Sequence, residues 1–189
     1  MCIRDRVIIG SSWPEDVNIA TQNISELIKK YDFQLIIAPH KISEIYLKST
    51  EDILCQNGLQ SVRFSERNTP NFLYEKNQII ILDTIGHLTE MYALTEIALV
   101  GGAYHYQVHN VLEPASHGVN LTFGPLYKNS HEAIDLVEKG HVTPVLTNQE
   151  FIRWLEQALN KPYRNKNLQA YVKSLSGATE KIMKSTNGA

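Results

Sequence analysis

The amino-acid sequence predicts an α/β fold, namely a doubly wound, Rossmann-like domain built on a parallel sheet. Short apolar runs alternate with longer amphipathic stretches through most of the 189 residues, as repeated strand–helix units do. The apolar runs hold almost no polar residue, which is typical of strands that helices cover on both faces. Because crossovers between parallel strands are right-handed, such units favour the doubly wound topology.

Length and composition indicate one globular domain of ordinary charge. The length suits one domain better than two, and 43% of the residues are hydrophobic while 20% are charged. The formal net charge of -2 gives no electrostatic reason to expect a nucleic-acid partner. No apolar run approaches the roughly 20 residues that span a bilayer. The isolated cysteines Cys2 and Cys55 fit a reducing, cytoplasmic setting better than a disulfide framework.

The elements expected in the first half follow from apolar runs and helical spacing. Strands are expected at residues 7–10, 35–38, 61–65 and 79–82, helices at residues 14–31 and 42–57, and a loop at residues 67–76. In the first helix Val17, Ile24 and Ile28 fall near one face, and Gly58 is a suitable terminator of the second. Residues 1–6 have mixed charge and no apolar core, unlike a signal peptide. We expect them to be an artefactual start outside the domain.

The second half continues the alternation and ends in a separate tail. Strands are expected at residues 97–100, 120–123 and 142–146, and helices at residues 88–95, 111–117, 130–138 and 149–160. In the tail, residues 163–189, Leu168, Tyr171 and Val172 are spaced for a helix that Gly177 interrupts. That helix needs an apolar surface to cover, so we expect the domain proper to comprise residues 7–162.

Ligands of an open parallel sheet bind beyond the carboxyl ends of its strands, and four segments there carry suitable residues. The first is residues 10–16. Gly10 lets the backbone approach a ligand, and the hydroxyls of Ser11 and Ser12 with a helix N-terminus favour an anion. Plain helix capping by Ser12, with Pro14 in the first turn, explains this spacing slightly better when the spacing is taken alone.

The second and third segments are less specific. After the strand at residues 35–38, His40 and Lys41 could contact a phosphate or a carboxylate, and a solvated loop explains them equally well. Residues 83–86 follow the most hydrophobic strand. They could close over a base or a sugar, or simply turn the chain.

The fourth segment, which follows the strand at residues 97–100, is the most informative. Because Pro114 lacks an N–H group, it is tolerated only near a helix start, which it places close to Leu112 or Glu113. A helix start there offers amide donors to a phosphate, and Glu113 could accept hydrogen bonds from two ribose hydroxyls. The alternative is a capping box of Asn110 and Glu113, which Pro114 weakens because it would lie one residue too deep.

Several other site types are disfavoured. His105 and His109 are four residues apart, but the sequence offers no third ligand at convincing spacing, so a zinc site is a minority interpretation. No G-x-G-x-x-G motif follows the first strand and no P-loop motif is present. No spacing indicates a Ser-His-Asp or Cys-His nucleophile.

Six segments stand in a particular order and spacing: residues 10–16, 36–40, 83–86, 99–102, 109–115 and 123–125. Over roughly residues 7–160 they resemble the C-terminal half of the 3-deoxy-D-manno-octulosonic acid (Kdo) transferases of lipid A and lipopolysaccharide biosynthesis. One motif departs from the family pattern, since the usual Gly-Gly-His-Asn is here residues 107–110, Gln-Val-His-Asn.

The resemblance implies the C-terminal domain of a B-type (GT-B) glycosyltransferase, with the CMP moiety of CMP-Kdo bound at the strand ends. Glu113 would accept from the ribose and Asn110 would donate on the phosphate side. The donor-binding residues it implies are Gly10, Ser11, Ser12, Glu15, Pro39, His40, Ile85, Gly86, Asn110, Leu112 and Glu113. The cleft-lining residues it implies are Gly102, Gly124, Pro125 and Asn129. It implies no metal and no other cofactor.

The resemblance also implies transfer of Kdo to lipid IVA at the cytoplasmic face of the inner membrane. The family's N-terminal domain carries the catalytic base and makes the peripheral membrane contact, so no residue of this chain is expected to be catalytic. Residues 163–189 would pack on that domain, and this chain alone would be incomplete, inactive and loosely held at its tail. The alternatives are another GT-B sugar-nucleotide enzyme, such as a UDP-sugar transferase or epimerase, and a stand-alone nucleotide-binding module.

Overall fold

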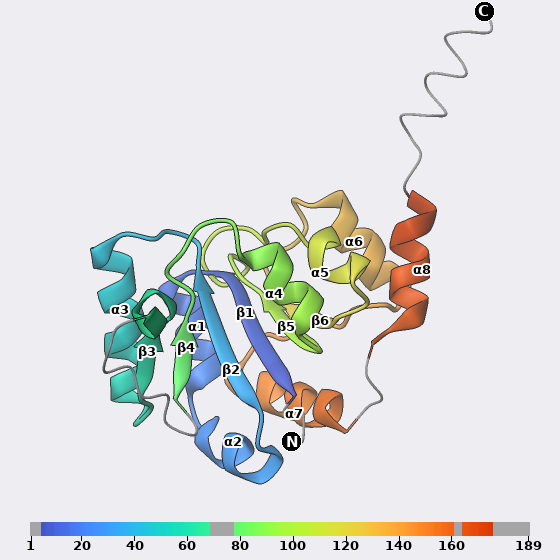
Figure 1. Cartoon of the computed structure of the whole chain (residues 1–189). Coiled ribbons are helices and arrows are strands. Elements are labelled where there is room, and N and C mark those ends of the chain that lie inside the picture. The colour runs from blue at the N-terminus through green and yellow to red at the C-terminus, as the bar shows by residue number, and fades with distance from the viewer. Residues whose placement is uncertain (1–4, 69–77, 161–163, 176–189) are drawn as a thin grey trace, which may run out of the picture.

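One parallel sheet organises the computed structural model, which describes residues 5–68, 78–160 and 164–175. Within these residues six strands lie in the order β3-β4-β2-β1-β5-β6 (Figure 1). They are β1 Arg6–Ser12, β2 Gln34–Pro39, β3 Ser61–Arg63, β4 Ile79–Ile81, β5 Ile97–Val100 and β6 Asn120–Phe123. The chain moves from β1 to one side for β2 and returns to the other side for β5. The sheet is therefore doubly wound, as predicted, with its switch point between β1 and β5.

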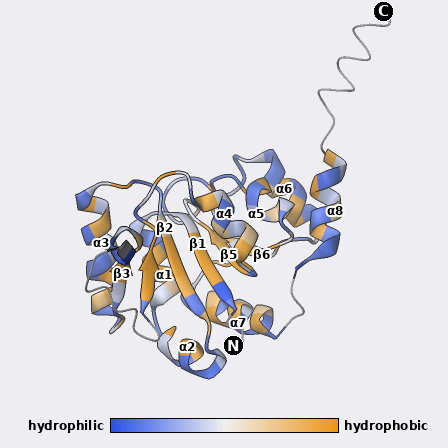
Figure 2. Cartoon of the chain, viewed as in Figure 1, coloured by the Kyte–Doolittle hydropathy of each residue, from blue (hydrophilic) through white to orange (hydrophobic). Residues whose placement is uncertain are grey.

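Helices cover both faces of the sheet. One layer is α1 Pro14–Thr21, α2 Ser25–Tyr31, α3 Glu44–Gln56 and α7 Asn148–Leu159, and the other is α4 Leu88–Leu94, α5 Leu112–Ser116, α6 His131–Glu138 and α8 Lys166–Leu175. Val7 and Ile9 pack into the first layer and Ile8 into the second, and none of the three is exposed. The strands are accordingly hydrophobic along both faces (Figure 2). No helix in the described ranges is long and apolar enough to cross a membrane.

The predicted helix at residues 14–31 is in fact two helices. Asn23 adopts φ +60°, a left-handed conformation that asparagine tolerates, and this residue separates α1 from α2. The break turns α2 toward α7, where Lys30 and the Tyr31 hydroxyl both hydrogen-bond Glu156. The apolar spacing continues through the break, so periodicity alone did not reveal it.

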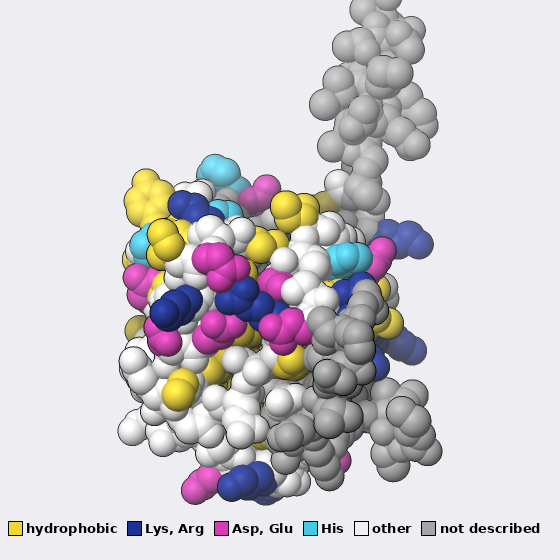
Figure 3. Space-filling view, turned by 60° about the vertical axis from the view of Figure 1, so that its left-hand side comes forward, with side chains coloured by type: hydrophobic (Ala, Val, Ile, Leu, Met, Phe, Trp, Pro, Cys, Tyr) yellow, Lys and Arg dark blue, Asp and Glu magenta, His cyan; other side chains and the backbone are white. Residues whose placement is uncertain are grey.

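The edge of the sheet at β3 is shorter than predicted. The strand expected at residues 61–65 ends at Arg63, and the 3₁₀ helix η1 Phe64–Asn68 follows it. Most of the loop expected at residues 67–76 lies outside the described residues. Acidic and basic side chains are interspersed on the face that carries α3 and β3 (Figure 3), where Arg63 hydrogen-bonds both Glu44 and Glu51 at 2.7 Å.

The strand expected at residues 142–146 is absent, since this segment is irregular. It runs beside β6 through a bond from the Val145 N–H to the Phe123 carbonyl (2.9 Å) and one from the Thr122 hydroxyl to the Thr143 carbonyl (2.7 Å). Pro144 lies between these contacts and has no N–H group to donate to a ladder. The apolar run is therefore accounted for by burial of Val142 and Val145 rather than by strand pairing.

Both ends of the described chain make contacts with the domain. Arg6 belongs to β1 and pairs with Gln34, although residues 1–6 were expected to lie outside. In the tail, α8 packs on α5 and buries Leu168 completely, while Arg164 donates to the His117 carbonyl (2.9 Å). Residues 164–175 thus have a surface to cover within this chain, and the expectation of a loosely held tail at residues 163–189 stays a prediction. Packing of the segment on a second domain remains a prediction.

Candidate functional site

A bulge at the end of β1 brings the first predicted segment against the second. The pairing register shifts between Gly10 and Ser12, which lies opposite Pro39. The extra residue is Ser11, whose φ of +51° is left-handed. The Ser12 carbonyl then accepts a hydrogen bond from the His40 N–H (2.9 Å), and the Ser12 hydroxyl donates to a β2 carbonyl (3.3 Å). The loops after β1 and β2 therefore begin side by side.

The Gly101–Gly102 turn after β5 lies against the same bulge with no side chain between them. The Gly101 N–H donates to the Gly10 carbonyl (2.8 Å), and a Cβ on Gly101 would lie 2.5 Å from the Ser11 carbonyl oxygen. Gly102 has φ +91°, and a Cβ there would lie 2.1 Å from the Gln107 carbonyl oxygen. Only glycine fits at either position. Gly102, predicted to line the cleft, is thus placed at the switch point.

Asp16, in the first turn of α1, connects these two loops although it has no exposed surface. One carboxylate oxygen accepts from the backbone N–H groups of Trp13 and Gly102, both at 2.8 Å. The other oxygen accepts from the backbone N–H of Tyr104 at 3.4 Å. Burial raises the pKa of Asp16, and these three hydrogen bonds to the carboxylate act against that rise.

The start of α1 differs from the capping expected there. The N-cap is Trp13 rather than Ser12, so capping by Ser12 is wrong, although Pro14 does occupy the first helical position. The Trp13 N–H donates a hydrogen bond to the carboxylate of Asp16, the third residue of the helix. Because Asp16 accepts that bond, the Ser12 hydroxyl is directed toward β2.

Aromatic and imidazole rings from three loops stack at this edge of the sheet. We call Trp13, His40, His105 and His109 the Trp13 cluster. The indole ring stacks on His105 with centroids 4.2 Å apart and on His40 at 5.1 Å. The indole N–H donates to His109 Nε2 (3.1 Å), and the His109 and His40 rings stack at 4.2 Å. The cluster thus joins the loops that follow β1, β2 and β5.

Two histidines of the cluster, His40 and His109, are uncharged at pH 7. Burial, and then the nearby His40, lowers the pKa of His109 to about 4. Burial, and then Lys41, lowers the pKa of His40. His105 has a different partner, since its Nδ1 lies 3.1 Å from the Glu15 carboxylate. The indole N–H of Trp13 is bonded to His109 instead. In the described ranges no group of three or more His, Cys, Asp or Glu side chains could hold a metal ion.

Helix α5 begins at Leu112, as Pro114 predicts. The Asn110 side-chain oxygen accepts from the Leu112 N–H at 3.0 Å, so that oxygen closes the turn before the helix. Glu113 accepts a hydrogen bond from the Thr89 hydroxyl of α4. The alternative of a capping box between Asn110 and Glu113 is therefore wrong. Glu113 is instead oriented by α4.

A cavity of about 470 Å³ lies between the β5–α5 loop and the start of α6. Three predicted residues, Asn110, Leu112 and Asn129, line it together with His109. The Asn129 carboxamide donates to the Gln107 side-chain oxygen (2.7 Å). The other two predicted cleft residues follow β6, where Gly124 is buried beneath the Tyr104 ring and Pro125 is exposed.

Two predicted donor residues, Ile85 and Gly86, stand apart from the rest. They follow β4 at the same edge of the sheet, with Ile85 88% exposed and Gly86 at φ +90°. Neither residue lines the cavity or joins the Trp13 cluster through a contact among the described residues. The preceding Asp83 instead accepts from the Ser65 N–H at 2.9 Å, which ties this loop to η1.

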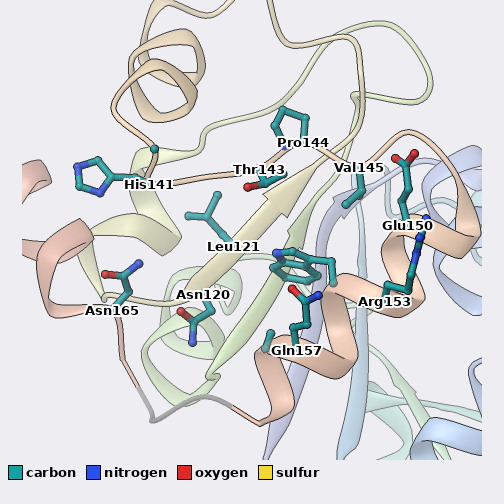
Figure 4. Close-up of a pocket in the computed structure, with 13 residues that line it drawn as sticks. Asn120, Leu121, His141, Thr143, Pro144, Val145, Glu150, Arg153, Gln157 and Asn165 are labelled. Atoms are coloured by element: carbon teal, nitrogen blue, oxygen red, sulfur yellow. The ribbon is translucent and has the colours of Figure 1, made fainter.

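Another cavity of about 460 Å³ lies along the open edge of β6, between α7 and the irregular segment at residues 142–146 (Figure 4). Asn120 of β6 lies beside Gln157 of α7 at one side of it, and Leu121, His141 and Thr143 line the other side. None of the predicted site residues lines this cavity. Cavity volume alone therefore does not mark the predicted site.

Sequence reasoning missed the residues that hold the predicted ones in place. Asp16 and Trp13 were recognised within a motif but not as site residues, and Thr89 was not singled out. A carboxylate just inside a helix that starts with proline is a signal for N-terminal capping, and it could have pointed to Asp16. The contacts that matter most, to Gly102 and Tyr104, join residues 86 and 88 positions apart.

The fold defines the class, since the six-stranded parallel sheet and its helices match C-terminal domains of GT-B glycosyltransferases. The chain superposes on the crystal structure of the C-terminal CMP-Kdo binding domain of WaaA from Acinetobacter baumannii with a TM-score of 0.76 and 22% identity, over 90% of this chain and 88% of that chain. Against WaaG, a glycosyltransferase involved in lipopolysaccharide biosynthesis, the TM-score is 0.54 at 11% identity, over 92% and 42% of the two chains.

Kdo transferases are among the sequence relatives of the chain. The 3-deoxy-D-manno-octulosonic acid transferase of Chlamydia trachomatis serovar D is 30% identical over 173 residues, 89% of this chain and 38% of that protein. The corresponding transferase of Aquifex aeolicus is 27% identical over 137 residues, 70% of this chain and 35% of that protein. No protein-family model matches the chain. The chain is homologous to the C-terminal part of the Kdo transferases and spans less than two fifths of the length of these relatives.

Proposed function

We propose that this chain is the donor-binding domain of a Kdo transferase and holds the CMP moiety of CMP-Kdo. The observation that carries the proposal is the meeting of three loops and the start of α5 at the switch point, where open parallel sheets bind ligands. The domain of WaaA that shares this fold is itself a CMP-Kdo binding domain, which supports the same ligand class here.

In this proposal each loop contributes a different kind of contact. Gly10 and Gly102 let the loops close on one another, because a Cβ on Gly10 would meet the Tyr92 ring and a Cβ on Gly102 would meet the Gln107 carbonyl. The Ser11 hydroxyl and the carboxamide of Asn110 supply uncharged hydrogen-bond donors, whereas the buried Ser12 hydroxyl already donates to the Ala38 carbonyl. Glu113, with two acceptor oxygens, receives two ribose hydroxyls, and Thr89 sets its orientation.

The chemical contribution of the domain is to stabilise the leaving group. Kdo transfer displaces CMP, and negative charge builds up on the departing phosphate. Donors that are already in place there lower the barrier without reorganising. The acceptor lipid IVA, the catalytic base and the peripheral membrane contact at the cytoplasmic face of the inner membrane belong to the rest of the intact protein.

Thermal-shift titration of the chain with CMP, UDP and NAD in parallel tests this proposal. A ligand that binds only the folded state stabilises it by mass action, so even millimolar affinity registers at tens of millimolar ligand. We expect CMP alone to raise the melting temperature, and we expect Glu113→Ala to abolish that shift. The matched control is Glu26→Ala, because Glu26 is exposed on α2 and lines none of the cavities described.

The other nucleotides make the outcomes distinct. Stabilisation by UDP in place of CMP would assign the chain to another GT-B sugar-nucleotide enzyme, the broader class that includes WaaG. A shift with NAD would move it outside the proposed function altogether. If CMP produced no shift, or if Glu113→Ala kept the whole shift, the assignment of this edge to the donor would be wrong.

A further inference from the structure

Asp16 is the only acidic or basic side chain that is buried in the described ranges. A buried carboxylate is costly unless hydrogen bonds replace its water. Here three backbone N–H groups do so, two of them at 2.8 Å. The position of Asp16 in the first turn of α1 adds the favourable field of a helix N-terminus. The carboxylate is therefore compensated by backbone alone, without a basic partner.

These hydrogen bonds join two crossovers rather than two neighbours in sequence. The Trp13 N–H belongs to the loop after β1, whereas Gly102 and Tyr104 belong to the loop after β5. At Gly101 the backbones of the two loops are in direct contact, because a Cβ on Gly101 would lie 2.5 Å from the Ser11 carbonyl oxygen. The same carboxylate thus sets the spacing of the two loops across the switch point.

The turn that Asp16 holds determines where the following residues lie. The carbonyl of Gly101 accepts from the His109 N–H (3.0 Å), and that of Gly102 accepts from the Tyr106 N–H (2.9 Å). The loop is therefore closed on the turn at its far end, immediately before Asn110 and the start of α5. Any change in the orientation of the turn would be passed on to Asn110.

We propose that Asp16 is a positioning residue that holds the loop after β5 in the geometry needed to bind the donor nucleotide. The inference rests on the proposed function and adds to it a residue that does not touch the ligand. The N–H groups of Trp13 and Gly102 are taken by Asp16, so the phosphate must use other donors. Presetting a loop in its bound conformation increases affinity by reducing the ordering that binding requires.

Asp16→Asn is the most informative substitution because it keeps the size and shape of the side chain. One acceptor oxygen becomes an NH₂ group, which would face backbone N–H donors and cannot accept from them. We expect CMP affinity to fall about tenfold, since a hydrogen bond to a charged acceptor is lost from each preset loop. Asp16→Ala should weaken CMP binding further, because all three bonds disappear.

Isothermal titration of CMP into the 189-residue chain gives the affinities, with Thr21→Val as the matched control. Thr21 is also buried on α1, and its hydroxyl accepts from the Asn57 carboxamide (2.9 Å) at the end of the helix away from the site. Its substitution destabilises the same helix without touching either loop. We expect Thr21→Val to leave CMP affinity within about twofold of the unsubstituted chain at a temperature where both are folded.

A spectroscopic measurement separates positioning from general stability. In Asp16→Asn, the backbone amide signals of Gly102 and Tyr104 should shift and their hydrogen exchange should accelerate. The amides of β1 and β5 should keep their protection, because the sheet pairing does not involve Asp16. Saturating CMP should restore part of the lost protection at Gly102.

The outcomes distinguish this inference from the function on which it rests. If the unsubstituted chain fails to bind CMP, the proposed function is wrong. If it binds CMP and Asp16→Asn binds equally well, or if Thr21→Val weakens binding as much, the positioning role is refuted while the function stands. Loss of affinity in Asp16→Asn with unchanged Gly102 and Tyr104 amides would also refute it, because the loop would not have moved.

Discussion

Two cavities of nearly equal volume differ in how their walls are built. The cavity of about 470 Å³ is walled by the start of α6 and by the β5–α5 loop, which the buried Asp16 ties at Gly102 to the loop after β1. At the edge of β6, the cavity of about 460 Å³ is walled mainly by α7 and by the segment that leads into it (Figure 4).

The candidate site is therefore distinguished by the backbone conformation and contacts of its loops rather than by the volume of a cavity. Left-handed backbone at a non-glycine residue costs on the order of 1–3 kcal/mol, and it persists only where its surroundings impose it. Ser11 meets that condition within a strand bulge, next to a turn in which only glycine fits. The β6 cavity lies at a sheet edge where strand pairing is incomplete, because Pro144 has no N–H group to donate to β6.

The largest expected effect comes from placing a methyl group between the two loops. In Gly101→Ala the new Cβ would meet the Ser11 carbonyl oxygen at 2.5 Å and the Ser12 Cα at 2.8 Å, so backbone must move. We expect the free energy of unfolding to fall by about 1–3 kcal/mol. The CMP-dependent thermal shift should disappear as well. Urea denaturation and thermal-shift titration measure the two effects.

The comparison variant is Gly140→Ala, since Gly140 lines the β6 cavity. A Cβ there meets nothing within 4 Å, and only its φ of +70° opposes the substitution. The expected loss is about 1 kcal/mol, with the CMP shift intact. If Gly140→Ala removed the CMP shift and Gly101→Ala did not, the site would have been assigned to the wrong cavity.

A smaller effect is expected from pH, through His109. Its pKa of about 4 in the folded chain lies below the ordinary value of 6.5, so between these values the unfolded chain binds a proton that the folded chain does not. Stability from this residue is complete above pH 6.5 and is lost as pH falls toward 4. After allowance for solvent screening, we expect about 1 kcal/mol between pH 7 and pH 5.

Urea denaturation at the two pH values measures this dependence. His109→Gln keeps an acceptor for the Trp13 indole and should reduce the loss on acidification by about 1 kcal/mol. Equal pH dependence in the unsubstituted chain and His109→Gln would show that burial of this imidazole does not oppose its protonation.

Most of the fold could be predicted from the sequence because its strands are continuous apolar runs, covered on both faces. The failures have local causes. At Asn23 the apolar spacing continues through a left-handed residue, so two helices resemble one. At residues 142–146 an apolar run suggests a strand, but Pro144 removes a donor that pairing would need. Arg63 ends β3 early because a 3₁₀ helix begins at the next residue.

The candidate site was predictable to the extent that local chemistry marks it. Pro114 alone fixes the start of α5, and the Gly101–Gly102 turn is recognisable by composition. The contacts that assemble the site are not local. Asp16 reaches Gly102 across 86 positions, and the Trp13 cluster draws rings from three loops. No periodicity or spacing records such pairs, so the supporting residues appear only once the sheet order is known.

The smallest expected effect tests the link between the two cavities. The Tyr104 hydroxyl donates to the carbonyl of Val145 (2.6 Å), which lines the β6 cavity, and burial followed by Asp16 raises the pKa of Tyr104, so the donor stays protonated. Tyr104→Phe should cost about 1 kcal/mol of unfolding free energy. CMP affinity should change less than about twofold, because Asp16 holds the Tyr104 backbone rather than its hydroxyl.

The control for that substitution is Tyr171→Phe, which removes an exposed hydroxyl 3.4 Å from Asp135 and should cost less than about 0.5 kcal/mol. Urea denaturation and CMP titration of both variants measure the difference. If Tyr104→Phe weakened CMP binding as much as Asp16→Asn, the side-chain link to Val145 would be as important as the backbone link to α1. The two cavities would then act as one coupled site, and the contrast between them would fail.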